Sequence, residues 1–128
     1  YTLCAAQWAS TLKYEDELFG SASDYAVLYE ETYGHAAPYQ AAESSAAVQV
    51  FADAFQRAGS LDPEAVRGAL SQTDMMTFYG PIKFDETGKN VSKPTVLFQV
   101  QDGKYVVVYP QEFAEAEFRW PTPAWSER

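Results

Sequence analysis

The sequence predicts an α/β fold, with helices in its first two thirds and a strand hairpin near its end. Apolar residues recur at helical spacing in three stretches between residues 21 and 70. From Thr77 onward the pattern becomes extended, and Asp102-Gly103 is a strong signal for a two-residue hairpin turn. Hydrophobic residues make up 47% of the 128, which is enough to fill the core of a single domain.

The first segment, residues 2–7, is short and apolar, and we expect a buried strand that opens into a turn at Trp8. It contains Cys4, the only cysteine, which excludes an internal disulfide and a multi-cysteine zinc site. In these apolar surroundings a buried, inert thiol is expected rather than a nucleophile. Residues 9–20 mix polar and apolar character and predict a loop with at most one helical turn.

A first helix is predicted after Ser21 or Ser23, either of which can cap it. Asp24 lies in its first turn, where the helix dipole favours a negative charge, and Gly34 supplies a left-handed end. Helical spacing predicts one buried stripe along this helix, formed by Tyr25, Leu28, Tyr29 and Tyr33.

A second helix, over residues 40–58, has the strongest pattern and ends at Gly59. Asp62 then caps a third helix, with Pro63 at its first position. The second helix is predicted to bury a face that Val50 broadens and that consists of Ala47, Phe51, Ala54, Phe55 and Ala58. The third is predicted to bury Ala65, Val66, Ala69 and Leu70.

Extended segments at 77–79 and 82–84 flank Gly80-Pro81, and residues 85–88 read as a turn. Pairing across the later Asp102-Gly103 turn predicts the cross-strand pairs Val100–Tyr105, Phe98–Val107 and Val96–Tyr109. A stretch with two prolines, residues 120–125, closes the chain and is expected to lie along a surface.

The charge balance excludes several classes of partner. Nine Lys+Arg against eighteen Asp+Glu give a net charge of −9, so the basic patch that a nucleic-acid binder needs is missing. The longest apolar run, residues 105–109, is far shorter than the roughly 20 residues that span a bilayer. The chain begins with Tyr1 rather than methionine, and we expect that an address signal was lost upstream.

Catalytic residues are not evident. His35 is the only histidine and is expected to face solvent, and no nucleophile elbow, phosphate loop or zinc-protease motif occurs. The adjacent carboxylates Glu30/Glu31 and Asp85/Glu86 are better explained as solvated surface, and residues 85–90 lack the spacing of a metal-binding loop. The sequence therefore predicts no enzyme, no metal site and no cofactor.

Binding without chemistry fits the residues better. Trp8 directly follows a strand, a position where aromatic residues line ligand clefts, although a core tryptophan explains it equally simply. Tyr39, Gln40 and Glu43 sit in the opening turns of the second helix, where backbone N–H groups can hold a polar ligand head. Taken alone, Gln40 and Glu43 are also ordinary residues for the start of a helix.

Read in order, these landmarks resemble the Leu/Ile/Val-binding type of substrate-binding protein of ABC transporters. No single piece is specific, but the ordered set covers nearly the whole chain. The pieces are Ala6-Gln7-Trp8, Phe19-Gly20-Ser21, Tyr33-Gly34 with Pro38-Tyr39, Ala41-Ala42-Glu43, the run from Ala58 to Asp62, Val66-Arg67, Ala69-Leu70, the run from Thr77 to Asp85 with Gly88, Gln99 to Lys104, Val107 to Pro110, and Trp120 to Trp125 with Arg128.

The resemblance implies part of a type I periplasmic-binding-protein fold: an open mixed sheet flanked by helices, with a C-terminal β-hairpin. Residues 1–110 would be the C-terminal portion of a two-lobed protein, comprising one lobe and a hinge crossing near 79–81, and residues 111–128 a tail. The implied hinge residues are Tyr79, Gly80 and Pro81, and the implied ligand contacts are Gln7, Trp8, Tyr39, Gln40 and Glu43. Many relatives carry a tyrosine where this chain has Ser44-Ser45, so the ligand need not be an aliphatic amino acid.

The implied function is the extracytoplasmic solute-binding component of an ABC importer, which binds an amino acid or a related small carboxylate or amide by hinge closure and delivers it to a membrane permease. The alternative is a ligand-sensing module of the same fold in a regulator or receptor. An amide- or ester-cleaving enzyme is disfavoured, because no nucleophile has a base. We expect a periplasmic or extracellular location, and we expect the isolated chain to self-associate through strand 2–7.

Overall fold

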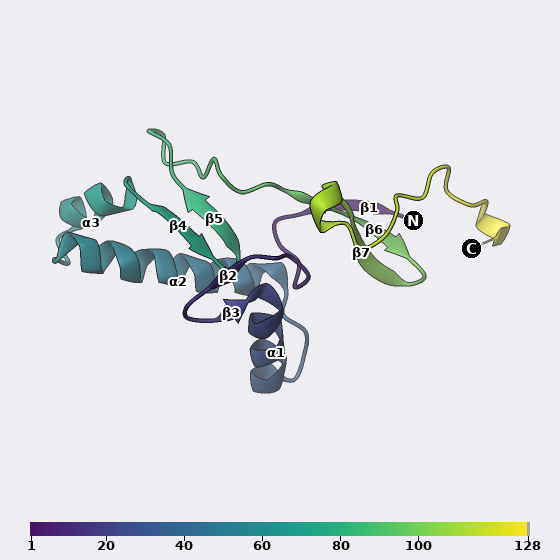
Figure 1. The fold of residues 1–128 in the computed structure, drawn as a ribbon, viewed down its shortest axis with the longest axis horizontal. Coiled ribbons are helices and arrows are strands. Elements are labelled where there is room, and N and C mark those ends of the chain that lie inside the picture. Colours follow the sequence, from purple (N-terminus) through teal and green to yellow (C-terminus); the bar gives the residue numbers. More distant parts are fainter. Residues whose placement is uncertain (128) are drawn as a thin grey trace.

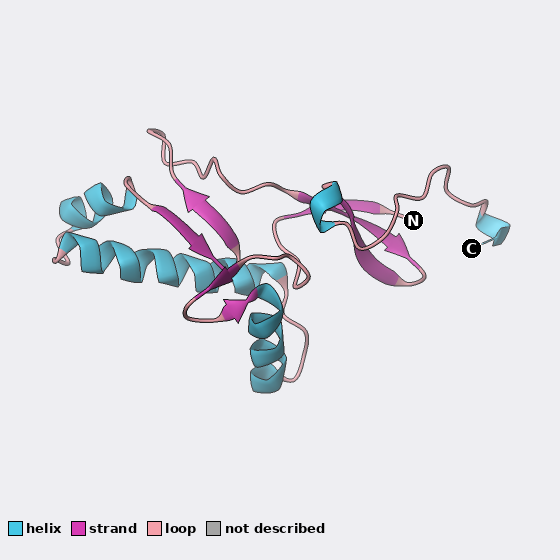
Figure 2. Ribbon diagram, viewed as in Figure 1, coloured by secondary structure: helices cyan, strands magenta, loops and turns pink. Residues whose placement is uncertain are grey.

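The computed structural model describes residues 1–127 and has short strands around a helical centre (Figures 1 and 2). Arg128, the end of the predicted tail, lies outside the described residues. In chain order the elements are β1 (Leu3–Ala6), β2 (Glu15–Asp16), β3 (Gly20–Ser21), α1 (Ala22–Tyr33), α2 (Tyr39–Ala58), α3 (Pro63–Leu70), β4 (Asp74–Thr77), β5 (Gly80–Lys83), β6 (Val96–Gln101), β7 (Lys104–Tyr109), and the 3₁₀ turns η1 (Gln111–Phe113) and η2 (Trp125–Glu127).

The strands form three small antiparallel sheets rather than the one mixed sheet that was predicted. The largest has the order β1-β6-β7, and the other two are the pairs β2-β3 and β4-β5. Within residues 1–127 every strand pair is antiparallel. The prediction of a mixed sheet therefore needs correction for this chain, because the segments between its paired strands supply no parallel partner.

Two stretches of chain connect the β1-β6-β7 sheet with the helical part (Figure 1). Residues 7–14 lead from β1 into the helices, and residues 84–95 return from β5 to β6. The predicted crossing near residues 79–81 is wrong. The chain turns back there, because β4 pairs with β5 in a tight hairpin that sets Thr77 opposite Gly80.

Helix α1 begins and ends where its capping residues predict. The Ser21 side chain accepts a hydrogen bond from the Asp24 N–H, and the Asp24 carboxylate accepts one from the Ser21 N–H, which completes a capping box. Gly34 follows in the left-handed conformation. The predicted buried stripe is only partly correct: Tyr25 is buried, but Leu28 and Tyr33 are exposed, because the helix meets the rest of the chain mainly through its first turns.

Removing the cap of α1 is expected to lower the free energy of unfolding by about 1 kcal/mol. In Ser21→Ala the N–H of Asp24 loses its side-chain acceptor. Urea denaturation measures the loss, and Ser23→Ala, an exposed residue of the same turn, is the control that should change little. Equal losses in the two variants would contradict the assigned cap.

Helix α2 buries a face rotated from the predicted one. Its buried residues are Ala42, Ala46, Val50 and Ala54, whereas Ala47, Phe51 and Phe55 are exposed. The small alanine side chains bring the helix close to its neighbours, and Ala54 packs with Val66 and Ala69 of α3. The phenylalanine rings are left at the side of this contact. Asp62 caps α3 through the N–H groups of Glu64 and Ala65, as predicted.

Phe78, in the β4–β5 turn, lies at the centre of the main core. Its ring stacks on Tyr25 at 4.1 Å between centroids and makes edge contacts with Trp8 and Phe19. Asp16 fixes the same turn from outside, because its carboxylate accepts hydrogen bonds from the Phe78 N–H and the Gln49 side chain. Burial alone would raise the pKa of Asp16, but these bonds and those from the N–H groups of residues 18 and 19 hold it below its usual value.

Strand β1 forms where it was predicted but is exposed rather than buried. Cys4 is likewise exposed, so the prediction of a buried thiol is wrong. The reason is that β6 covers only one edge of β1, and no strand of residues 1–127 lies on the other. The β6–β7 hairpin pairs Val100 with Tyr105 as predicted, but a bulge shifts Tyr109 from Val96 to Leu97.

Candidate functional site

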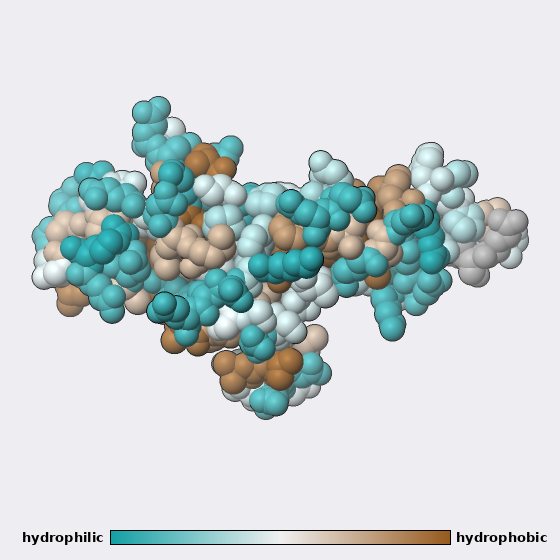
Figure 3. Space-filling model, in the orientation of Figure 1, coloured by the Kyte–Doolittle hydropathy of each residue, from teal (hydrophilic) through white to brown (hydrophobic). Residues whose placement is uncertain are grey.

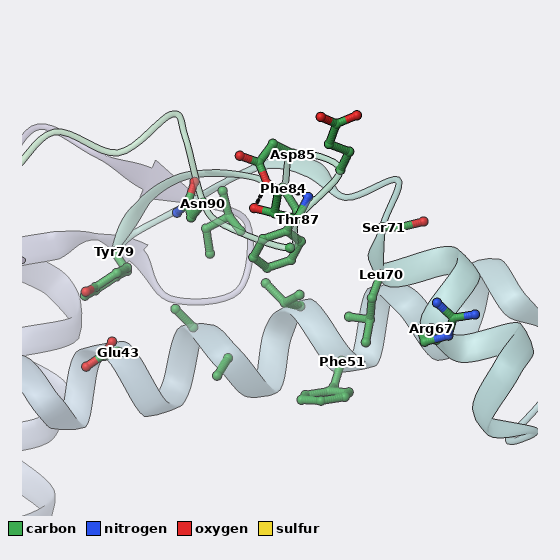
Figure 4. Close-up of a pocket in the computed structure, with 16 residues that line it drawn as sticks. Glu43, Phe51, Arg67, Leu70, Ser71, Tyr79, Phe84, Asp85, Thr87 and Asn90 are labelled. Atoms are coloured by element: carbon green, nitrogen blue, oxygen red, sulfur yellow. Dashed lines mark hydrogen bonds between the residues drawn. The ribbon is translucent and has the colours of Figure 1, made fainter.

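A groove of about 620 Å³ runs along α2 and is the main candidate for a binding site (Figure 4). Helix α2 forms one wall, and β5 with the loop that follows it forms the other. The walls are mostly apolar side chains, and the ends are polar. The lining residues are Glu43, Ala46, Ala47, Val50, Phe51, Arg67, Leu70, Ser71, Tyr79, Ile82, Phe84, Asp85, Glu86, Thr87, Gly88 and Asn90.

Glu43 and Tyr79 lie at one end of the groove (Figure 4). Burial raises the pKa of Tyr79 to about 12, and the negative charge of Glu43 adds to the effect, as does Tyr39. The Tyr79 hydroxyl therefore stays protonated and can donate or accept a hydrogen bond. This end of the groove combines a carboxylate with a phenol, a pair suited to an ammonium group.

Lys93 lies beside this end, on the connection between β5 and β6. Its ammonium is 3.8 Å from the centroid of the Tyr79 ring and 5.5 Å from that of Tyr14, and it donates a hydrogen bond to the Tyr79 carbonyl. Lys93 thereby ties both connecting stretches to the β4–β5 turn, since Tyr14 belongs to the first and Lys93 to the second. Burial lowers the pKa of Lys93 to about 8, and the carboxylate of Glu43 offsets part of this effect.

The lowered pKa of Lys93 predicts a stability that rises with pH. In the unfolded chain the lysine titrates near 10.5, so above pH 8 the unfolded chain holds more protons than the folded one. The free energy of unfolding should rise between pH 8 and about pH 10. It should fall again above that, because the pKa of Tyr79 is raised to about 12.

Urea denaturation across this pH window measures the rise. Lys93→Met should abolish it, whereas Lys104→Met, at an exposed position on β7, should retain it. A wild-type protein whose stability is flat or falls between pH 8 and pH 10 would contradict the assignment.

The structure brings together some of the predicted ligand contacts and separates others. Of these five, Glu43 alone is among the residues that line the groove, and Tyr39 lies close enough to influence the pKa of Tyr79. Trp8 is buried in the core, where its indole N–H donates to the Phe78 carbonyl at 3.4 Å. Gln7 and Gln40 are exposed on the first connection and at the start of α2.

The three predicted hinge residues lie at the groove end instead of in a crossing strand. Tyr79 lines the groove and carries Lys93 on its ring. Gly80 has a φ of 136° and packs against the Lys93 ammonium and the Tyr14 ring, so a side chain there would meet both within 3.3 Å. Pro81 follows in β5 and pairs with Met76.

Sequence reasoning missed Lys93, Tyr14 and the apolar wall formed by Ile82 and Phe84. Lys93 lies in a polar loop, where nothing in the local pattern distinguishes it from a solvated lysine. The alternation of Ile82 and Phe84 about Lys83 did indicate a strand with one buried face, and that signal could have identified the wall.

Other kinds of site find no support in the described part of the chain. Residues 1–127 contain no group of three or more His, Cys, Asp or Glu side chains placed to hold a metal ion. No helix among them is both long and apolar enough to cross a membrane.

Comparisons with known proteins agree with this architecture. A family described as "Periplasmic binding protein" matches residues 5–104. The crystal structure of the leucine-binding protein LivK from Thermotoga maritima superposes with a TM-score of 0.69, over 82% of this chain and 29% of LivK, at 24% sequence identity. The α/β fold class, as part of a periplasmic-binding-protein fold, is thereby confirmed.

Curated relatives are longer than this chain. Proteins called "Leu/Ile/Val-binding protein homolog 7" from Brucella abortus, Brucella suis and Brucella melitensis are 36% identical over 78 residues. The match covers 57% of this chain and 19% of each relative, so the chain spans only a small part of their length. With the family match extending over most of the residues, the resemblance predicted from the sequence is confirmed: this chain belongs to the periplasmic binding protein family.

Proposed function

We propose that this chain forms part of a solute-binding protein that captures an amino acid, or a related small carboxylate or amide, for an ABC importer. The family match and the relatives named for binding Leu, Ile and Val, or leucine, support this class of ligand. A binding protein of this kind carries out no covalent chemistry.

The observation that carries the proposal is Glu43, a carboxylate at the end of a groove with apolar walls. In the proposed complex the ligand ammonium lies between Glu43 and Tyr79, and an aliphatic or aromatic side chain lies against Val50 and Ile82.

The start of α2 is the proposed position of the ligand carboxylate. Pro38 precedes the helix and provides no side-chain cap, so the N–H groups of Tyr39 and Gln40 have no side-chain acceptor at this end. Gln7 and the Trp8 backbone, on the adjoining connection, complete the proposed contacts.

Closure on the ligand is proposed to bend the two connections, residues 7–14 and 84–95, with Tyr79, Gly80 and Pro81 serving as the support against which Lys93 holds them. Residues 1–110 would then be one portion of a two-lobed protein and residues 111–128 its tail. The closed form would dock on a membrane permease, in the periplasm or at the cell surface.

Titration of the ¹⁵N-labelled chain with L-leucine, L-valine and benzoate tests the proposal by NMR. We expect weak, saturable shifts of amides at the start of α2 and around Tyr79, because one wall of a two-walled cleft is present. Glu43→Gln should weaken binding of the two amino acids by about tenfold, the worth of one charge-assisted hydrogen bond, and leave benzoate binding nearly unchanged.

Glu31→Gln is the matched control, since it removes an exposed carboxylate from α1, away from the groove. Two results would contradict the proposal: shifts confined to other surfaces, or a Glu43→Gln variant that binds L-leucine as well as the wild type does.

A further inference from the structure

The two outer edges of the β1-β6-β7 sheet differ in how the chain treats them. At the β7 edge the chain covers its own strand, because the Val107 carbonyl accepts a hydrogen bond from the Glu115 N–H and the Val107 N–H donates to the Glu115 carboxylate. At the β1 edge no strand of residues 1–127 is paired. Sheet edges left in this state pair readily with further strands.

The hydrogen-bond alternation identifies which groups point out of the β1 edge. Thr2 lies opposite Val100, and its carbonyl accepts the Val100 N–H, so this pair is hydrogen-bonded. In an antiparallel ladder alternate residues bond to the same neighbour, so Thr2, Cys4 and Ala6 face β6. The N–H and C=O groups of Leu3 and Ala5 therefore point away from the sheet.

Nothing in this strand resists pairing. Proteins protect edge strands with charged side chains, prolines or bulges. Residues 2–6, the ladder-forming stretch, contain none of these and read Thr-Leu-Cys-Ala-Ala. The stretch is symmetric about Cys4 in its outward groups, with Leu3 on one side and Ala5 on the other, so an antiparallel copy of itself is a complementary partner.

We propose that the 128-residue chain dimerises by antiparallel pairing of β1 with β1 of a second copy about a two-fold axis at Cys4. Leu3 of each copy then exchanges hydrogen bonds with Ala5 of the other, and the six strands form one continuous sheet. The two Cys4 residues face each other as a non-hydrogen-bonded pair, with Cα atoms about 4.5 Å apart. That separation lies within the range of roughly 4.4–6.8 Å that a disulfide requires. The inference does not depend on the proposed ligand.

Charge sets the conditions for this association. Each copy carries a net charge of −9, so the two repel each other at long range. Salt shortens the Debye length from about 30 Å at 0.01 M to about 10 Å at 0.1 M. The dimer should therefore become tighter as sodium chloride is added, as expected for a contact made by an uncharged strand.

Analytical ultracentrifugation of the chain and of two Ala5 variants tests the interface. Ala5→Pro removes the outward N–H and leaves the β1–β6 ladder intact, whereas Ala5→Val keeps the donor. The two-fold axis makes the change twice, so two hydrogen bonds are lost and the dissociation constant should rise by about thirtyfold. Ala5→Val should dimerise like the wild type. Circular dichroism checks that both variants are folded, and Ala5→Lys, which places a charge on the edge, is the second disruptive variant.

Cys4 reports the register independently. Treatment with diamide should couple two Cys4 thiols into one intermolecular disulfide, the diamide taking up the two protons and two electrons that the thiols lose. Cross-linking should be fast in the wild type and in Ala5→Val and slowed by at least about tenfold in Ala5→Lys, in proportion to the lost dimer.

A monomeric wild-type chain at high salt would overturn the proposal. So would a dimer that Ala5→Pro and Ala5→Lys leave unchanged, or one abolished by Phe51→Ser, because Phe51 is exposed on α2 and its involvement would assign the contact to that helix. Rapid dimerisation without Cys4 cross-linking would overturn the register.

Discussion

Phe78→Ala is expected to lower the free energy of unfolding by about 3–5 kcal/mol, the largest effect of any substitution considered for this protein. The Phe78 ring is fully buried and contacts the aromatic rings of Trp8, Phe19 and Tyr25. Truncation leaves a cavity between elements that are far apart in the sequence, and it removes aromatic contacts beyond the lost area. Urea denaturation measures the loss.

The control for this substitution is Phe118→Ala. Phe118 is half exposed in the C-terminal segment, and its removal should change stability by no more than about 0.5 kcal/mol. A Phe78→Ala loss below that of an ordinary surface substitution would show that the β4–β5 turn is not the centre of the core.

Gly80→Ala is expected to cost about 3 kcal/mol, because it combines two penalties. Its φ of 136° lies where residues with a side chain are strained, and an added Cβ would lie 3.1 Å from the Lys93 ammonium and 3.2 Å from the Tyr14 ring. The methyl group should therefore also displace Lys93 from the Tyr79 ring. The rise in stability between pH 8 and pH 10 should weaken in the same variant.

Gly34→Ala separates strain from crowding. Gly34 also has a positive φ, of 75°, but nothing lies within 4 Å of the position that a Cβ would take. Its loss should be about 1 kcal/mol, the cost of the left-handed conformation alone. Equal losses at Gly80 and Gly34 would contradict the close packing of Lys93 and Tyr14 on the β4–β5 turn.

Local signals in the sequence predicted the elements well, because they depend on neighbouring residues. Ser21, Gly34, Asp62 and Pro63 occupy the capping positions expected of them. The Asp102-Gly103 turn gives the expected hairpin, with the bulge at Leu97 and Phe98 as its one departure. Such features are encoded within a few residues of where they act.

Burial was harder to predict, because it depends on which surfaces other segments cover. Phe51 and Phe55 have the composition of a buried face, yet the alanines beside them make the contact. Strand β1 is apolar and was expected to be covered on both sides, but only β6 pairs with it. Helical or strand periodicity identifies a face that can be buried and does not identify its partner.

The candidate site shows the same division. Glu43 was singled out from its place near the start of a helix, and it lines the groove. Lys93 could not be found this way, since its significance comes from Tyr14 and Tyr79, which are distant in sequence. Trp8 was a candidate for either the cleft or the core, and packing against Phe78 assigns its ring to the core.

The measurement that tests the central proposal most directly is a set of intermolecular nuclear Overhauser effects between the methyl groups of L-leucine and the labelled chain. The proposal predicts contacts to the side chains of Val50, Ile82 and Tyr79, which line the groove that begins at Glu43. Contacts confined to any other surface, or none at ligand concentrations that saturate the amide shifts, would contradict it.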